Sequence, residues 1–211
     1  GALQAELDRT VRAEPRERGD RRDNLLRFLG MFYLNLGRTS DAEAVFARMQ
    51  PRRQPAARAL TAFVRGSRQP PYTGAHVYPD SGITAVILAR AGQLRAARAA
   101  RTALESIQGS DGDLMEVEGE ILAASGETRA ASAVLRESLD RLRLSGSPLY
   151  YLGSERLAAL LAETGQTGEA ARVLKAAVDA RARAYNEMGP AGAFWIRDCR
   201  LLAELTHSAA R

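Results

Sequence analysis

Four glycines separate stretches of this chain that have the periodicity of helices. Apolar residues recur at intervals of three and four along almost the whole sequence, and no sustained alternation predicts a strand. Gly37, Gly92, Gly126 and Gly165 each stand where one stretch stops, and an Ala-rich stretch begins a few residues later. Glycine readily adopts the left-handed backbone conformation that ends a helix. Each of the four is therefore predicted to be the turn of a helical hairpin.

The chain is expected to be all-α, with about ten or eleven helices. Aromatic residues make up only 6% of it, so alanine and leucine, both good helix formers, supply most of the apolar surface. Helices are predicted at residues 3–13, 21–36, 39–49, 54–66, 81–91, 93–107, 112–125, 127–143, 149–164, 166–184 and 192–207.

The spacing of the glycines predicts an irregular repeat. Gly92 and Gly126 are 34 residues apart, Gly126 and Gly165 are 39 apart, and Gly37 and Gly92 are 55 apart. A period of about 34 residues is typical of stacked helical hairpins, and the longer intervals have room for insertions in turns. Repeats are predicted near 23–51, 78–108, 112–143 and 151–184, with an inserted helix and loop at 53–80 and a capping helix at 192–207.

Residues at matching places in these repeats resemble the tetratricopeptide repeat consensus. They are Leu26, Leu29, Gly30, Tyr33, Ala42 and Phe46 in the first repeat, Ala85, Leu88 and Ala97 in the second, Met115, Gly119, Leu122, Ala131 and Leu135 in the third, and Leu157, Ala158, Leu161, Ala170 and Leu174 in the fourth. Arg101 and Glu118 depart from the pattern, since both stand where a large apolar residue is usual. Over about residues 23–184 the chain thus resembles a bacterial tetratricopeptide-like domain. The resemblance implies a single domain over 1–211, built as a superhelical array of antiparallel hairpins, an α-solenoid.

Small residues recur at one place in all four repeats. Gly30, Ala85, Gly119 and Ala158 occupy the position at which the two helices of a hairpin are expected to cross. A helix-interior glycine costs roughly 1 kcal/mol relative to alanine, so the two glycines indicate a close approach that excludes a larger side chain.

The resemblance implies a concave surface lined by the first helix of each hairpin, which would bind a protein or a basic or extended peptide without catalysis. The residues expected to face this groove are Asn24, Arg27, Met31, Asn35, Asp113, Glu116, Glu120, Glu155 and Glu163. The groove would be basic to neutral at one end and acidic at the other. The alternative that these carboxylates are simply solvated on exposed helix faces stays open. The asparagine and lysine set with which some relatives clamp a C-terminal carboxylate is not matched.

The loop at 67–80 supports an alternative function. It contains Tyr72, His76 and Tyr78, and long loops in compact domains are often functional. It could close over the groove as the lid of a small-ligand sensor in a kinase or transcription regulator, or it could merely span the inserted helix.

Signals for chemistry and for other partners are weak. Two histidines and the lone Cys199 have no partners at metal-ligand spacing, so no metal, cofactor or enzymatic activity is expected. Arg95, Arg98 and Arg101 form a basic stripe on one helix, but no aromatic residues interleave with them to stack bases, so nucleic acid is disfavoured. The apolar run at 83–89 is far too short to cross a membrane.

The wider context is also an expectation from sequence. The chain starts at Gly1 rather than at a methionine, as an excised or processed part of a larger protein would. The resemblance and the arginine- and alanine-rich composition favour a cytoplasmic module of a bacterial signalling or regulatory protein.

Overall fold

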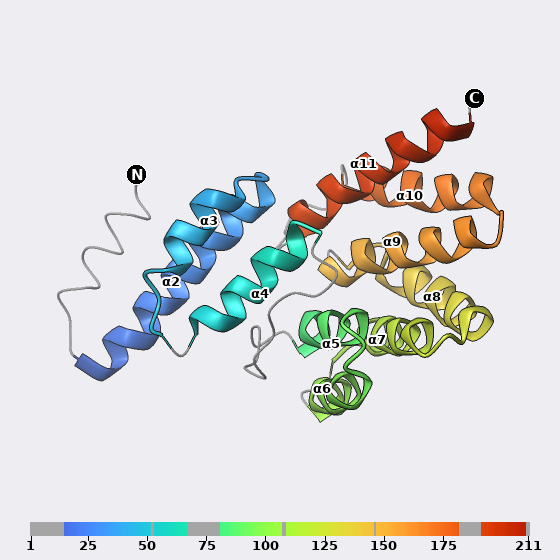
Figure 1. Ribbon diagram of the computed structural model, residues 1–211. Coiled ribbons are helices and arrows are strands. Elements are labelled where there is room, and N and C mark those ends of the chain that lie inside the picture. Colours follow the sequence, from blue (N-terminus) through green and yellow to red (C-terminus); the bar gives the residue numbers. More distant parts are fainter. Residues whose placement is uncertain are drawn as a thin grey trace. The chain divides into compact units, whose positions relative to one another are not determined.

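The computed structural model describes residues 15–51, 53–66, 81–106, 109–145, 147–181 and 191–209 (Figure 1). Every regular element within these ranges is an α-helix, and the ranges hold ten of them. The all-α class is therefore confirmed. The helix predicted at 3–13 lies outside the described residues. The chain divides into two compact units, Gly1–Val77 and Tyr78–Arg211, where the sequence predicted one domain.

The N-terminal unit contains α2 (Pro15–Asn35), α3 (Thr39–Phe46) and α4 (Gln54–Val64). α3 packs against α2 as the second helix of the first predicted hairpin, and it also contacts α4, the predicted inserted helix. α2 begins six residues before the predicted start at residue 21, because the first turn opens with Pro15, whose fixed φ suits that position.

The close approach predicted at Gly30 is confirmed. A β-carbon built there would lie 2.1 Å from Cε1 of Phe46, so the aromatic ring of α3 rests directly on the backbone of α2. Ala42 and Phe46 are both buried, as are Leu26 and Leu34 on α2. The Phe46 ring occupies the space that a methyl group at residue 30 would fill, so glycine is needed for the two helices to approach this closely.

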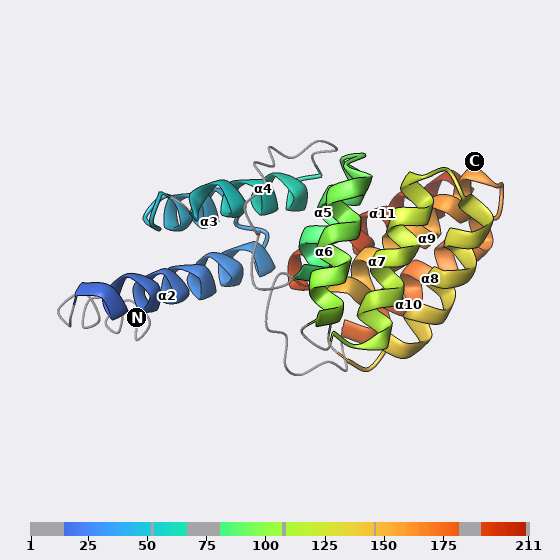
Figure 2. The same cartoon turned by 90° about the horizontal axis from the view of Figure 1, so that it is seen from below.

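The C-terminal unit contains three hairpins and a final helix. The hairpins are α5 (Ser81–Arg90) with α6 (Leu94–Ser106), α7 (Asp111–Ala124) with α8 (Thr128–Leu142), and α9 (Pro148–Glu163) with α10 (Thr167–Arg181); α11 (Ala191–Ala209) follows. The first helices of the hairpins and the final helix contact one another in the order α5, α7, α9, α11. Each second helix contacts its own first helix and the helix that follows it in this order, which for α10 is α11 (Figure 2).

The four predicted turn glycines all have a left-handed backbone, with φ between 70° and 84°. At the end of α2 the amide of Arg38 donates to the carbonyl of Tyr33 and the amide of Gly37 donates to that of Leu34, both at 2.9 Å. These two bonds satisfy carbonyls that the helix end would leave unpaired. The same pair of bonds recurs at Gly92, Gly126 and Gly165.

One hydrophobic core of the C-terminal unit lies between its last two hairpins. Its buried residues include predicted consensus positions of the third and fourth repeats, namely Ala131, Leu135, Leu157, Ala158, Leu161, Ala170 and Leu174. Each fully buried leucine stabilises the fold by about 1.5–3 kcal/mol. A β-carbon on Gly119 would lie 2.6 Å from Leu135, so the second predicted glycine crossing is also confirmed. The indole of Trp195 on α11 donates to the carbonyl of Val178 on α10 at 3.2 Å.

None of the helices in the described ranges is long and apolar enough to span a membrane.

Candidate functional site

Two of the carboxylates expected in an open groove are fully buried. Glu116 and Glu120 on α7 are both 0% exposed, and Glu155 on α9 is half-buried. The prediction that Glu116 and Glu120 face solvent is therefore corrected, because the neighbouring first helices cover this side of α7. Of the other two predicted residues, Glu163 is exposed at the end of α9, and Asp113 is half-buried near the start of α7.

Asp113 has a structural role at the start of α7. Its carboxylate accepts hydrogen bonds from the hydroxyls of Ser110, at 2.8 Å, and Ser147, at 2.9 Å. Ser110 is the N-cap of α7 and accepts in turn from the amide of Asp113. An acidic side chain in the first turn also stabilises the positive end of the helix dipole. Asp113 therefore joins the start of α7 to the start of α9.

Glu120 is held between two arginines. The guanidinium of Arg90, at the end of α5, donates to Oε1 of Glu120 from Nε at 2.9 Å, and Arg156 on α9 donates from Nε to Oε2, also at 2.9 Å. Burial alone would raise the pKa of Glu120, but the two guanidiniums outweigh it and hold that pKa below its ordinary value. Glu120 is thus an ionised carboxylate inside the fold.

Glu155 extends this arrangement to a third arginine. Its Oε1 accepts from Nη1 of Arg90 at 2.7 Å and from Nη2 of Arg197, on α11, at 2.6 Å. Arg90 also donates to the carbonyl of Leu152 at 2.9 Å. The inner ionic cluster, as we name it, consists of Arg90, Glu120, Glu155, Arg156 and Arg197. It connects the four first helices of the C-terminal unit.

Glu116 lies beside this cluster as a buried carboxyl group. Burial and the nearby charge of Glu120 raise its pKa well above the ordinary value and outweigh the attraction of Arg90. Its Oε2 is 3.3 Å from the hydroxyl of Ser138, while Oε1 has no hydrogen-bond partner. A β-carbon on Gly153 would lie 2.1 Å from Oε2. The carboxyl group therefore fills the space that glycine leaves on α9.

Asp198 on α11 is a second buried acid. It is 0% exposed, and neither carboxyl oxygen has a hydrogen-bond partner. Burial, followed by the negative charge of Glu155, raises its pKa to about 9 despite the opposing effect of Arg197 and Arg90. A carboxylic acid with that pKa is neutral at pH 7, which avoids the cost of an uncompensated buried charge.

The sequence contained only part of the signal for this cluster. Carboxylates at 116 and 120 share one face of a helix, and this spacing was taken to indicate an open groove. The three arginines of the cluster stand on three other helices: Arg90 and Arg156 pair with Glu120, and Arg197 pairs with Glu155, so no local pattern connects these charges. Only the packing of the first helices brings Arg90, Arg156 and Arg197 together.

The two departures from the repeat consensus form an ion pair. Nε of Arg101 on α6 lies 3.0 Å from Oε2 of Glu118 on α7, with both side chains partly exposed. Each charged residue stands where the repeat consensus has a large apolar group; the two attract each other as an ion pair, although Nε of Arg101 makes no hydrogen bond. Arg101 therefore does not belong to an open basic stripe, although Arg95 and Arg98 are exposed.

The residues predicted for the groove in the N-terminal unit share one face of α2, because they are three or four residues apart, but they differ in exposure. Asn24 is exposed, Arg27 and Asn35 are half-buried, and Met31 is buried. This face is therefore only partly open to solvent.

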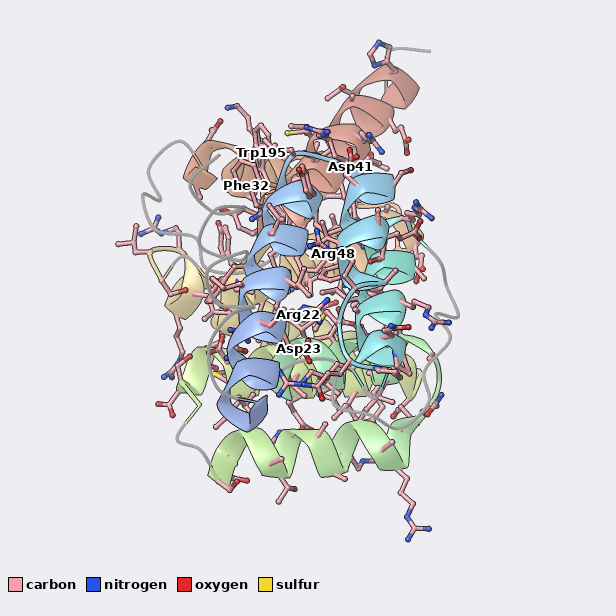
Figure 3. All side chains as sticks on the ribbon, turned by 90° about the vertical axis from the view of Figure 1, so that its left-hand side faces the viewer. Arg22, Asp23, Phe32, Asp41, Arg48 and Trp195 are labelled. Atoms are coloured by element: carbon pink, nitrogen blue, oxygen red, sulfur yellow. The ribbon has the colours of Figure 1, made fainter. Side chains whose placement is uncertain are left out.

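α2 and the turn that follows it instead expose a row of large apolar side chains that was not predicted from the sequence. Phe28 is 43% exposed, Phe32 57% and Leu36, the first residue after α2, 53%. Their spacing of four residues places them along one side of α2, and we name them the α2 apolar stripe. Phe32 is labelled on α2 in Figure 3. In sequence they have the periodicity of core residues, so only the fold reveals their exposure.

One arginine stacks on a residue of the α2 apolar stripe. The guanidinium of Arg27 lies 4.8 Å from the centre of the Phe28 ring, and that of Arg38 lies 4.8 Å from the ring of Tyr33, which is not part of the stripe. Arg38 also bonds Asp41 at 2.7 Å, and Arg22, labelled on α2 in Figure 3, is exposed. Stacking of arginine on aromatic rings places positive charge beside apolar surface.

A small hollow lies between α3 and α4. Its volume is about 240 Å³, and it is lined by Glu43, Phe46, Ala47, Gln54, Arg58 and Thr61. Sites for small ligands usually enclose about 300–1,000 Å³, so this hollow is below the usual range. The loop residues Tyr72, His76 and Tyr78 lie outside the described residues. In the part of the chain that the structure covers, no group of three His, Cys, Asp or Glu side chains could hold a metal ion.

Comparisons with known proteins leave the chain without an assigned family. No protein-family model matches the sequence, and neither a curated protein nor a solved structure gives a significant match. The resemblance to the tetratricopeptide repeat family therefore stays a prediction from the residues.

Proposed function

We propose that this chain is a non-catalytic protein-binding module built from tetratricopeptide-like hairpins, and that it binds its partner through the α2 apolar stripe. The observation that carries the proposal is the exposure of three large apolar side chains in a row, Phe28 and Phe32 on α2 and Leu36 directly after it. Soluble proteins seldom leave such side chains contiguous on the surface unless a partner covers them.

The contact pattern of the C-terminal unit supports the scaffold part of the proposal. Each second helix contacts two successive first helices, as in arrays of stacked hairpins.

The α2 apolar stripe replaces the acidic groove as the proposed docking surface. Glu116 and Glu120 are buried and Glu120 is already paired with two arginines, so neither can receive a basic peptide without opening the fold. The small-ligand alternative rests on the loop at 67–80, and no observation on the described residues favours it.

The proposal is tested by a matched pair of exposed apolar residues. Phe32→Glu places a charge in the α2 apolar stripe, whereas Leu144→Glu does the same at a side chain that is 83% exposed in the C-terminal unit. Tagged wild type, F32E and L144E are used to isolate bound proteins from source cells, which are then quantified by mass spectrometry. We expect F32E to lose a set of proteins that wild type and L144E both retain, with helical content unchanged. Identical sets from all three would refute the proposal.

We also propose, from the sequence resemblance alone, that the module belongs to a larger bacterial signalling or regulatory protein in the cytoplasm.

A further inference from the structure

We propose that the hollow between α3 and α4 receives one large apolar side chain of a protein partner, and that Arg58 binds an acidic residue next to that side chain. The inference adds a second contact site in the N-terminal unit. It rests only on the protein-binding part of the proposed function, since no residue of the α2 apolar stripe lines the hollow.

Hydrogen bonds connect α3 and α4 at both ends of the hollow. At one end the guanidinium of Arg65 donates to both carboxylate oxygens of Glu43, from Nη1 at 2.6 Å and from Nη2 at 2.9 Å. At the other end the side-chain amide of Gln54 donates to the carbonyls of Ala47 and Met49, both at 2.9 Å. These bonds fix the spacing of the two helices, so the hollow is formed before a partner binds.

The buried residues that line the hollow offer an apolar surface of the size of one side chain. Phe46 is 2% exposed, and Thr61 is fully buried with its hydroxyl donating to the carbonyl of Ala57 at 2.9 Å. A cavity of about 150 Å³ is enough to bind a benzene ring, whereas sites for small ligands usually exceed about 300 Å³. The volume of about 240 Å³ therefore matches one phenylalanine or leucine side chain. Pockets that take a single buried anchor are where protein partners gain much of their affinity.

Arg58 gives the lining of the hollow a positive charge that no described residue compensates. Its Nη2 donates to Oε1 of Gln54 at 3.1 Å, but Gln54 is neutral, and none of the ion pairs among the described residues includes Arg58. The charge of Glu43, on the opposite helix, is already neutralised by Arg65. A carboxylate beside the apolar anchor of the partner therefore gains charge-assisted hydrogen bonds from Arg58, and an ammonium group is repelled.

The test uses the full chain, isotopically labelled for NMR, and short peptides with blocked ends. Each peptide has a central phenylalanine flanked by two aspartates, two asparagines or two lysines. Binding is followed by the shifts of the backbone amide signals of α3 and α4. We expect saturable shifts with the aspartate peptide and a dissociation constant on the order of 1 mM, because one anchor and one carboxylate make few contacts.

The other peptides separate the apolar and the charged part of the inference. The asparagine peptide should bind about threefold to fivefold more weakly than the aspartate peptide, and the lysine peptide at least about tenfold more weakly. Replacing the phenylalanine of the aspartate peptide by alanine should abolish saturable binding, because the hollow then receives no anchor.

Variants locate the binding. Ala47→Phe places a ring at the exposed edge of the hollow and should abolish binding of the aspartate peptide. Arg58→Glu should reverse the preference, so that the lysine peptide binds more tightly than the aspartate peptide, which a merely structural role of Arg58 would not produce. Arg98→Glu makes the same change of charge at an exposed residue of α6 and should leave all binding unchanged. Circular dichroism confirms that each variant retains its helices.

Several outcomes would overturn the inference. Equal binding of the aspartate and asparagine peptides, or an unreversed preference in R58E, refutes the acidic neighbour. No saturable shift in α3 and α4 refutes the hollow as a docking site. Phenylacetate that binds as tightly as the aspartate peptide assigns the hollow to a small organic acid.

Two further outcomes assign the hollow to this chain itself. A concentration-dependent dimer that A47F abolishes assigns it to a second copy. Nuclear Overhauser contacts in the free protein from the ring of Phe46 to residues outside 15–66 assign it to another segment of the same chain. Failure of the proposed function is a separate result, because F32E changes the α2 apolar stripe and should bind the aspartate peptide as the wild type does.

Discussion

Replacing Asp198 by asparagine should change the pH dependence of stability in a calculable way. The carboxyl group is fully buried, and neither of its oxygens has a hydrogen-bond partner. Burial and Glu155 raise its pKa from 3.8 to about 9, against the opposing charges of Arg197 and Arg90. Between these two values the folded protein holds a proton on Asp198 that the unfolded chain lacks. Asparagine has nearly the same shape and carries no charge at any pH.

The sign and size of the effect follow from this proton. Because the pKa of Asp198 is raised in the folded state, the stability that this group contributes is fully present below about pH 4 and is lost as the pH rises through about 9. Each pH unit in this window lowers the free energy of unfolding by about 1.4 kcal/mol, or about 4 kcal/mol between pH 5 and pH 8. An asparagine amide would be as unpartnered here as the neutral carboxylic acid is, so the desolvation costs of the two side chains are comparable. The two stability curves should therefore be close near pH 4–5 and diverge as the pH rises, with the advantage of D198N growing by about 4 kcal/mol between pH 5 and pH 8.

The assay is urea unfolding at a series of pH values from 5 to 9, followed by tryptophan emission. Trp195 is the only tryptophan and lies on α11, three residues before Asp198, so its emission reports unfolding of the C-terminal unit. Asp140→Asn serves as the control, because Asp140 is exposed on α8. Its curve should stay parallel to that of the wild type. Parallel curves for wild type and D198N over the whole range would refute the assignment of a neutral buried acid.

Three further predictions concern packing and paired charges. Arg90→Ala should lower the free energy of unfolding by about 3–5 kcal/mol in a urea titration, because it leaves two carboxylates of the inner ionic cluster without their shared cation. Gly30→Ala should lower it by about 1–2 kcal/mol despite the better helix propensity of alanine, since the new methyl group meets the ring of Phe46, and adding Phe46→Leu should restore part of the loss; a Gly30→Ala protein as stable as wild type would contradict the crossing. Arg101→Leu with Glu118→Leu should melt at a higher temperature than either single variant in a thermal scan, because each single change leaves one charge facing leucine; additive effects would show that the pair is not coupled.

Local signals in the sequence predicted most of the helical architecture. The turns at Gly37, Gly92, Gly126 and Gly165 were predictable because a left-handed backbone at a helix end is a requirement of the few residues around it. The crossing at Gly30 was predictable because a glycine inside a helix is costly unless the space is needed. These features depend on residues that are close together in the chain, so they can be predicted from short stretches of sequence.

The surfaces could not be predicted in the same way. Glu116 and Glu120 have the spacing of a helix face, but whether that face meets solvent or Arg90 and Arg156 depends on helices far away in the sequence. Phe32 has the periodicity of a core residue, yet it is exposed. Periodicity determines which residues share a face and leaves open what lies opposite it.

The inner ionic cluster has a consequence for how the C-terminal unit is assembled. The hairpins pack through surfaces that are rich in alanine and leucine, and such surfaces specify their partners only weakly. With Arg90, Glu120, Glu155 and Arg197 contributed by four different helices, any other order would bury at least one charge without its counterpart. Such a charge costs several kcal/mol, far more than the difference between two well-packed apolar surfaces. We expect the hairpins to be neither interchangeable nor removable one at a time, so that this unit evolves, and can be redesigned, only as a complete set.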